Sequence, residues 1–249
     1  MPFWVAAALA CTTDQDSTDL QGPSSKTVLD LVDVKTNPTS YEWFDFRPNV
    51  QKLILSGAAE TEHVAILWYT VADGSVGLHF HSKTESVYVI DGTQTDAKGV
   101  YATSTVYFNP PGSGHQISGS SGFFLLAYAS PPDFANTASI GEYTPLRIDT
   151  SDPELTTKYP FEAKATGLRA FEAPLDSTGG MSGQFIEITS AGAEQAFTGN
   201  YLLVLGGRCD IDGAELEAQR LMVTKTIEPQ PFRVKAAAEG ACLALGVSF

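Results

Sequence analysis

The stretch from Gly77 to His115 constrains the fold more than any other part of the chain. It reads GLHFHSKTESVYVIDG, then a spacer rich in hairpin-forming residues, then NPPGSGH. Three of the chain's four histidines lie within it. His79 and His81 are two residues apart, and alternate residues of a strand project from the same face, so we expect their imidazoles to point together. The stretch therefore predicts strands joined by tight turns, with histidines gathered on one face.

Two further side chains complete a candidate metal site. Glu85 opens the next predicted strand, which ends at the Asp91-Gly92 turn, and His115 follows a Pro-Pro-Gly-Ser-Gly bend. Three imidazoles and one carboxylate that converge on one point form a site for a divalent transition metal, for which iron, zinc and manganese are candidates. The predicted ligands are His79, His81, Glu85 and His115. The alternative is a degenerate site that folds empty.

The spacing of these residues resembles the two motifs of the cupin superfamily. The first motif is HxHxxxE closed by Gly92, and the second is PxGxxH, which begins at Pro110 and ends at His115. The phrase NPPGSGHQISGSSGFFLL looks most like the cupin domain of ChrR-type anti-sigma factors and of related small dioxygenases. Gly119 stands where the family usually has asparagine, a departure that removes no ligand. This close resemblance covers residues 60–130.

The rest of the chain is typical of an all-β protein. Short runs of aromatic and β-branched residues alternate with Gly, Pro and Asp clusters, and none has a helical period. We predict strands over residues 28–34, in 41–55, and over 64–71 and 122–132. Such runs suit a jelly roll, whose interior can hold one small ligand.

The second half repeats the pattern of the first. Residues 200–207 resemble 85–92, and 239–247 resemble 121–129, at offsets of 115 and 118 residues. A repeat of this length indicates a duplicated domain. The resemblance therefore implies two tandem cupin jelly-roll (double-stranded β-helix) barrels, of which only the first has a metal site, because no histidine follows His115.

This organisation predicts four segments. Residues 1–25 are a signal- or lipoprotein-like N-terminus with a polar tether, 26–134 are the metal-binding barrel, 135–160 are a linker, and 161–249 are the degenerate barrel. The apolar run FWVAAALA before Cys11 is too short to span a bilayer and resembles the end of a bacterial lipoprotein signal. We therefore expect a bacterial cell-envelope protein on the periplasmic side, with lipid on Cys11. An ordinary N-terminal tail is the alternative.

In the degenerate barrel, charged residues take the places of two ligands. Counting from the repeat, Glu194 replaces His79 and Arg233 replaces His115. Buried charges are costly unless they are paired, so we expect an ion pair at the vacated centre. The alternative is that both side chains lie on the outer face, which leaves the interior open as a ligand pocket.

Further expectations concern the surroundings of the two centres. Strand parity places Val87 and Val89 on the inward face with Glu85, in a pocket lined mainly by apolar and aromatic side chains. His63, in a polar stretch, is expected to be a solvated residue at the start of a strand. Cys209 and Cys242 fall on strands that are neighbours in a cupin jelly roll. They could form a cross-strand disulfide or remain two buried thiols.

Charge narrows the partners. The net charge of −14 disfavours direct binding to nucleic acid and to anionic lipid head groups. We therefore expect contact with a membrane only through the lipid on Cys11. The expected ligand is a small molecule, and a homodimer is a candidate assembly. The resemblance implies an oxygenase acting on a small diketone- or phenol-like molecule, or alternatively a non-catalytic sensor or structural cupin. Oxalate-type decarboxylation receives less weight, since no cation is placed by its spacing beside the ligands; those in this region are Arg47, Lys52, Lys83 and Lys98.

Overall fold

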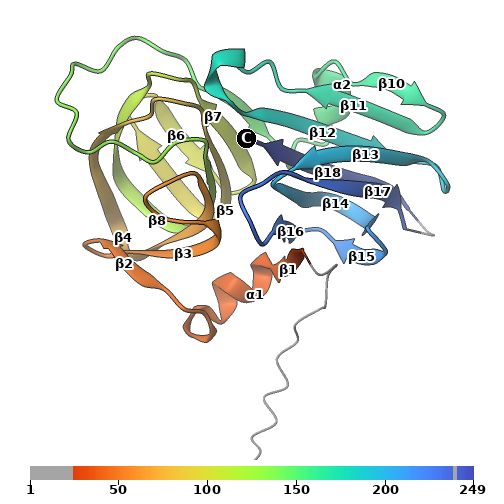
Figure 1. Cartoon of the computed structure of the whole chain (residues 1–249), viewed down its shortest axis with the longest axis horizontal. Coiled ribbons are helices and arrows are strands. Elements are labelled where there is room, and N and C mark those ends of the chain that lie inside the picture. Colours follow the sequence, from red (N-terminus) through yellow and green to blue (C-terminus); the bar gives the residue numbers. More distant parts are fainter. Residues whose placement is uncertain (1–24, 238–239) are drawn as a thin grey trace, which may run out of the picture.

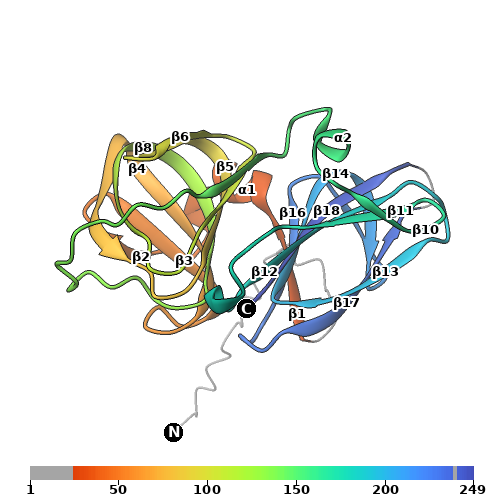
Figure 2. The ribbon, with the colours of Figure 1, turned by 90° about the horizontal axis from the view of Figure 1, so that it is seen from above.

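Two antiparallel β-sheets lie side by side in the computed structural model, which describes residues 25–237 and 240–249 (Figures 1 and 2). The all-β prediction is confirmed, and each sheet forms one barrel. Short helical turns occur between strands; they are α1 (Leu31–Thr36), η1 (Pro38–Ser40), α2 (Leu155–Lys158) and η2 (Ser177–Gly179). In the part of the chain described, no helix has the length and apolar character needed to cross a membrane.

The first barrel is an eight-stranded sheet in the order β2-β3-β4-β8-β5-β7-β9, with β6 paired to β5. Its strands are β2 (Phe44–Arg47), β3 (Val50–Gly57), β4 (His63–Phe80), β5 (Glu85–Asp96), β6 (Gly99–Ala102), β7 (Thr105–Asn109), β8 (Gly114–Tyr128) and β9 (Leu146–Asp149). The long strand β8 lies between β4 and β5 and pairs with both, so it joins the two parts of the sequence that contain the predicted ligands.

The second barrel is a ten-stranded sheet built around β14 and β18. Its strands are β1 (Lys26–Asp30), β10 (Glu162–Ala165), β11 (Leu168–Glu172), β12 (Ser182–Ile188), β13 (Glu194–Gly199), β14 (Tyr201–Ile211), β15 (Ala214–Glu217), β16 (Arg220–Thr224), β17 (Gln230–Ala236) and β18 (Cys242–Ser248). Strand β14 pairs with β18 as β5 pairs with β8, which is the relation that the sequence repeat predicts.

Alternation along the strands divides the apolar side chains between three clusters. In β5, Val87 and Val89 belong to the interior of the first barrel, as predicted, whereas Tyr88 and Ile90 belong to a cluster shared by both sheets. Leu203 of β14 enters this shared cluster from the other side. This cluster is also the largest of the three, so the two barrels pack against each other through one extensive apolar interface.

The chain crosses between the barrels in ways that the sequence did not indicate. The strand expected over residues 28–34 ends at Asp30, whose side chain accepts a hydrogen bond from the Val32 amide (2.8 Å) and so caps α1. Strand β1 pairs with β16 of the second barrel, although residues 26–134 were expected to form the first. Within the expected linker 135–160, β9 pairs with β7 of the first barrel.

The interior of the second barrel is apolar, and the predicted ion pair at its centre is wrong. Phe197 and Phe232 are directly opposite in β13 and β17, with ring centroids 6.2 Å apart. Arg233 is exposed, and Glu194 pairs instead with Lys235 (3.2 Å) near the surface. Since a one-residue shift moves a side chain to the other face of a strand, the repeat alignment fails there. The interior is packed rather than open.

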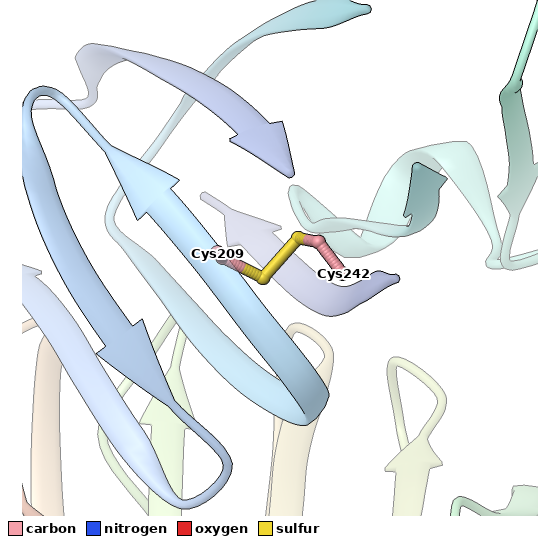
Figure 3. Close-up of a disulfide and its surroundings, with 2 residues drawn as sticks. All are labelled: Cys209 and Cys242. Carbon is pink, nitrogen blue, oxygen red and sulfur yellow. A yellow bond between two sulfur atoms is a disulfide. The ribbon is translucent and has the colours of Figure 1, made fainter. Parts of the chain in front are cut away.

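A disulfide joins β14 to β18 in the second barrel (Figure 3). Cys209 and Cys242 are both fully buried, with Cα atoms 4.9 Å apart, so of the two alternatives the structure has the disulfide. The covalent bond lies in the apolar cluster that fills this barrel.

Candidate metal centre

The predicted ligands come from the ends of three strands. His79 lies near the end of β4, His81 follows that strand, Glu85 opens β5, and His115 is the second residue of β8. His79 and His115 are directly opposite in the β4–β8 pairing. The turn between β4 and β5 then returns the chain so that His81 and Glu85 approach the same point.

All four side chains are buried, and their ligand atoms lie within 4.8 Å of one another. His81 Nε2 is 3.2 Å from His115 Nε2, and each of these nitrogens is 3.5 Å from Glu85 Oε2. Two atoms each about 2.1 Å from one metal are separated by about 3.0 Å at a right angle and about 3.4 Å at a tetrahedral angle. The donor set therefore fits a single divalent metal ion.

Two of the imidazoles are oriented by partners outside the cluster. His115 Nδ1 is 3.3 Å from Asp96 Oδ2, and His79 Nδ1 is 2.9 Å from the Gly77 carbonyl oxygen. Each partner oxygen accepts a hydrogen bond from the protonated Nδ1, which leaves the Nε2 lone pair available. Such partners typically fix the tautomer and orientation of a metal-binding histidine.

The carboxylate and the third imidazole are held by neighbours of a different kind. Asn109 Nδ2 donates a hydrogen bond of 2.7 Å to Glu85 Oε2. The ring of Tyr128 stacks on His81 with an angle of 8° between the planes and centroids 5.7 Å apart. These contacts limit the rotamers of both ligands.

Burial keeps His79 and His81 in the neutral form that binds metals. Desolvation lowers the pKa of His79 to about 3, and the neighbouring His115 and His81 lower it further in the same direction. Desolvation, with His115, also holds the pKa of His81 well below its ordinary value. A divalent ion would therefore meet unprotonated nitrogens at neutral pH.

The pocket beside the cluster has a mainly apolar and aromatic lining, as predicted, and the described lining contains no Lys or Arg. The lining residues besides His79, Glu85, His115 and Gln94 are Phe46, Leu67, Tyr69, Val76, Ile117, Leu126, Tyr128 and Pro132. The cavity itself is small, about 10 Å³, which is room for about one water-sized group. Among the described residues, Tyr69 Oη and Gln94 Oε1 have no hydrogen-bond partner.

The prediction that His63 is solvated is wrong, because the residue is fully buried. Its Nδ1 is 2.7 Å from the Thr61 carbonyl oxygen, its Nε2 is 3.2 Å from Lys52 Nζ, and its ring packs on Tyr128. Burial, followed by the Lys52 charge, lowers the pKa of His63 to about 4. The histidine is a partner for Lys52 and does not belong to the ligand cluster.

Two cations lie closer to the centre than the sequence indicated. Lys52 is fully buried, with Nζ 3.9 Å from the ring centroid of Phe46 and 5.1 Å from that of Tyr128. The Arg47 guanidinium lies 3.8 Å from the ring centroid of Phe134, which itself stacks on His79. Aromatic rings thus separate both cations from the ligand cluster.

Sequence reasoning named the candidate ligands, which the structure brings together, but missed the residues that support them. Asp96 lies eleven residues after Glu85, at the end of β5, where its Oδ1 accepts the amides of Lys98 (2.7 Å) and Gly99 (3.1 Å). The Asp-Ala-Lys-Gly turn signal was readable, but its orientation toward His115 was not. Asn109 and Lys52 gave no signal, because their roles depend on strand register.

Comparison with known proteins assigns the first half of the chain. Residues 32–130 match the family model of the ChrR cupin-like domain, the resemblance that the two motifs indicated. This part of the chain is similar to a cupin domain. A search of curated proteins found no significant match.

Solved structures extend the similarity of fold to both barrels. A candidate dioxygenase from Nostoc punctiforme has a TM-score of 0.59 at 11% identity and covers 91% of this chain and 83% of its own. A candidate glyoxylate-induced protein from Pseudomonas aeruginosa has a TM-score of 0.52 at 14% identity, covering 98% and 93%. A deletion mutant of Bacillus subtilis oxalate decarboxylase has 0.50 at 14% identity, covering 93% and 79%. The two-barrel arrangement is therefore that of bicupins, and at these identities the likeness concerns the fold.

Proposed function

We propose that this bicupin is a metal-dependent oxygenase that acts on a small diketone- or phenol-like molecule. The observation that carries the proposal is the convergence of three buried imidazoles and one carboxylate beside an apolar pocket. Iron or manganese bound there would supply Lewis-acid activation of a substrate oxygen and an open position for dioxygen. Its predicted metal ligands are His79, His81, Glu85 and His115.

The polar atoms of the lining support an oxygen-rich ligand. The Tyr69 hydroxyl is a donor and Gln94 Oε1 an acceptor, and neither has a partner among the described residues. Leaving such a buried group unpaired costs about 1–3 kcal/mol. A ligand that carries both a carbonyl and a hydroxyl oxygen would satisfy the two groups and be oriented by them.

The charges around the pocket favour the deprotonated form of such a ligand. Lys52 and Arg47 are separated from the ligand cluster by the rings of Tyr128, Phe46 and Phe134. Because little water screens charges in a buried environment, the positive charges of Lys52 and Arg47 would stabilise a negative charge on a bound ligand. An enolate or catecholate is therefore a better substrate form than the neutral molecule.

Oxygen uptake by metal-loaded protein tests the proposal. The apo protein is loaded with Fe²⁺ or Mn²⁺ and mixed with acetylacetone or catechol in an oxygen electrode. We expect uptake that depends on metal and substrate and is lost in His115→Ala. Tight retention of zinc, with no oxygen uptake by any loaded form, would contradict it.

A non-catalytic metal sensor or structural cupin is the second candidate. The observation that favours it is the cavity volume of about 10 Å³, because a diketone would enter only if lining side chains such as Phe46 or Pro132 moved. A zinc ion with a closed coordination shell would need no such space. The identity of the metal bound in the native host distinguishes the two candidates.

We propose that the protein works in the bacterial cell envelope, on the periplasmic side, anchored through lipid on Cys11. The N-terminal signal lies outside the described residues, so support comes from the sequence pattern and from the Cys209–Cys242 disulfide, a bond that persists in oxidising compartments. A small molecule is then the expected partner, with a homodimer as candidate assembly. Membrane fractionation of wild type and Cys11→Ser tests the anchor: release of only the variant is expected, and equal distribution would contradict it.

A further inference from the structure

We propose that the second barrel positions the metal ligands of the first through Gly179, so that the degenerate barrel is a working part of the metal centre. This inference rests on the proposed metal site. In both views the η2 turn, drawn in teal, lies between the two barrels (Figures 1 and 2). The carbonyl oxygen of Gly179 accepts a hydrogen bond from the Thr84 amide at 3.0 Å.

The position of Thr84 gives this contact its importance. Thr84 directly precedes Glu85 and is 2% exposed. Its amide is held by the second barrel, while its carbonyl oxygen accepts a hydrogen bond from the amide of Ala129 (3.3 Å), just after β8. Both backbone polar groups of Thr84 are thus hydrogen-bonded, which restrains the backbone from which the Glu85 side chain leaves.

Gly179 contacts both metal motifs at once. A Cβ at Gly179 would lie 1.9 Å from Thr84 Oγ1 in the first motif and 3.2 Å from Pro111 Cγ in the second. The two motifs are also joined to each other, because the Gly112 amide donates to the His81 carbonyl oxygen (2.7 Å) and the His81 amide to that of Ser113 (2.9 Å). A side chain at Gly179 would therefore displace the segments that carry His81, Glu85 and His115.

The turn that carries Gly179 is itself well ordered by local bonds. Asp176 accepts hydrogen bonds from the amide and the hydroxyl of Thr178, both at 2.8 Å, and the Gly179 amide donates to the Asp176 carbonyl oxygen (2.9 Å). Strand β12 begins soon afterwards and continues into the second sheet. Gly179 therefore rests on a rigid support, and we assign it as a positioning residue.

A change at Gly179 separates this role from ordinary interface packing. We titrate apo protein with Co²⁺ alone and follow its d–d absorption, which reports the geometry of the ligands. In Gly179→Ala we expect the dissociation constant for Co²⁺ to rise about 10- to 100-fold, the range seen when supporting residues of metal sites are lost. The absorption spectrum should change as well.

Two controls and one rescue make the test specific. Gly141→Ala is the matched control, because its Cβ would have no atom within 4 Å. Leu203→Ala creates a cavity in the shared interface away from the ligands, so it should lower the melting temperature without changing Co²⁺ affinity. Thr84→Ala removes the atom that the new methyl group meets and loses no hydrogen bond of the Thr84 hydroxyl, which has none among the described residues. Added to Gly179→Ala, it should restore part of the affinity.

The outcomes distinguish this inference from the proposed function. Wild type that binds no Co²⁺ would overturn the metal site and this inference together. Wild type that binds Co²⁺, with Gly179→Ala within about twofold of it, would overturn the inference alone. If Gly179→Ala does not fold, Asp176→Ala loosens the same turn from an exposed position: a raised dissociation constant supports the inference, and an unchanged one overturns it.

Discussion

The two barrels share a topology but use their interiors differently. In the first barrel His79 faces His115 across β4 and β8, whereas in the second the rings of Phe197 and Phe232 face each other across β13 and β17. The first interior gathers buried polar groups that a metal ion would satisfy, whereas an apolar cluster that contains the disulfide fills most of the second. The first barrel therefore holds the candidate site, and the second holds an apolar core with a covalent cross-link.

Buried lysines show the same contrast. Lys26 lies over the ring of Phe232 (4.1 Å) in the second barrel, and its ammonium pairs with Asp212 at 2.7 Å. Lys52 lies over Phe46 in the first barrel, but among the described residues no carboxylate is within 4.0 Å of it. A buried charge without a paired counter-charge is costly, so we expect Lys52 to lower the stability of the first barrel.

Loss of a ligand should have the largest effect. His115→Ala removes one of four donors, and we expect Co²⁺ binding to fall below detection in a titration. Since a ligand at 1,000 times its dissociation constant stabilises a protein by about 4.1 kcal/mol, the metal-dependent rise in melting temperature should vanish too. Phe232→Leu in the second barrel is the control and should retain Co²⁺ binding. Equal loss in both variants would contradict the functional division of the barrels.

Removal of the disulfide should have the next largest effect, and on stability alone. The bond closes a loop with a sequence separation of 33, for which chain entropy gives about 3–4 kcal/mol. We expect Cys209→Ala/Cys242→Ala to lose stability of this order in urea unfolding. Co²⁺ affinity of the folded variant should remain that of wild type, and a large drop would mean that the disulfide also shapes the metal site.

Lys52 provides a test by pH. Burial lowers the pKa of Lys52 to about 8, against about 10.5 in the unfolded chain, so the unfolded state binds more protons between these values. Wild-type stability should therefore rise from pH 8 to 10.5, and at pH 7 the variant Lys52→Met should be more stable by up to about 3 kcal/mol. The gain should disappear above pH 10.5. Lys26→Met, which leaves Asp212 unpaired, should be less stable than wild type, and matching behaviour of the two variants would remove the contrast.

Asp96→Asn should have the smallest effect. It weakens the acceptor of the His115 Nδ1 proton without removing a ligand. We expect Co²⁺ affinity to fall about 10- to 100-fold, with little change in the stability of the apo protein. The matched control is Asp210→Asn in β14 of the second barrel, which should leave affinity unchanged. An unaffected Asp96→Asn would show that the Asp96 contact does not orient His115.

The sequence by itself determined the fold class, the duplication and the four candidate ligands. These depend on local regularities: the two-residue alternation of strands, glycine and proline at turns, and the spacing of His79, His81, Glu85 and His115 within two short motifs. Their order along the chain is enough to predict which side chains share a face. The same reasoning failed for Glu194 and Arg233, because a shift of one residue in the weaker repeat reverses the face.

Only the tertiary structure decided how the two barrels depend on each other. The decisive contacts join residues that are distant in sequence. They are the pairing of β1 with β16, the packing of Lys52 against His63, the Cys209–Cys242 disulfide, and the contact of Gly179 with Thr84. Such contacts depend on strand register and on the packing of one sheet against another, to within one residue and a few tenths of an ångström. No local pattern encodes distances of that kind, so the sequence could name the candidate metal ligands but not the residues that hold them in place.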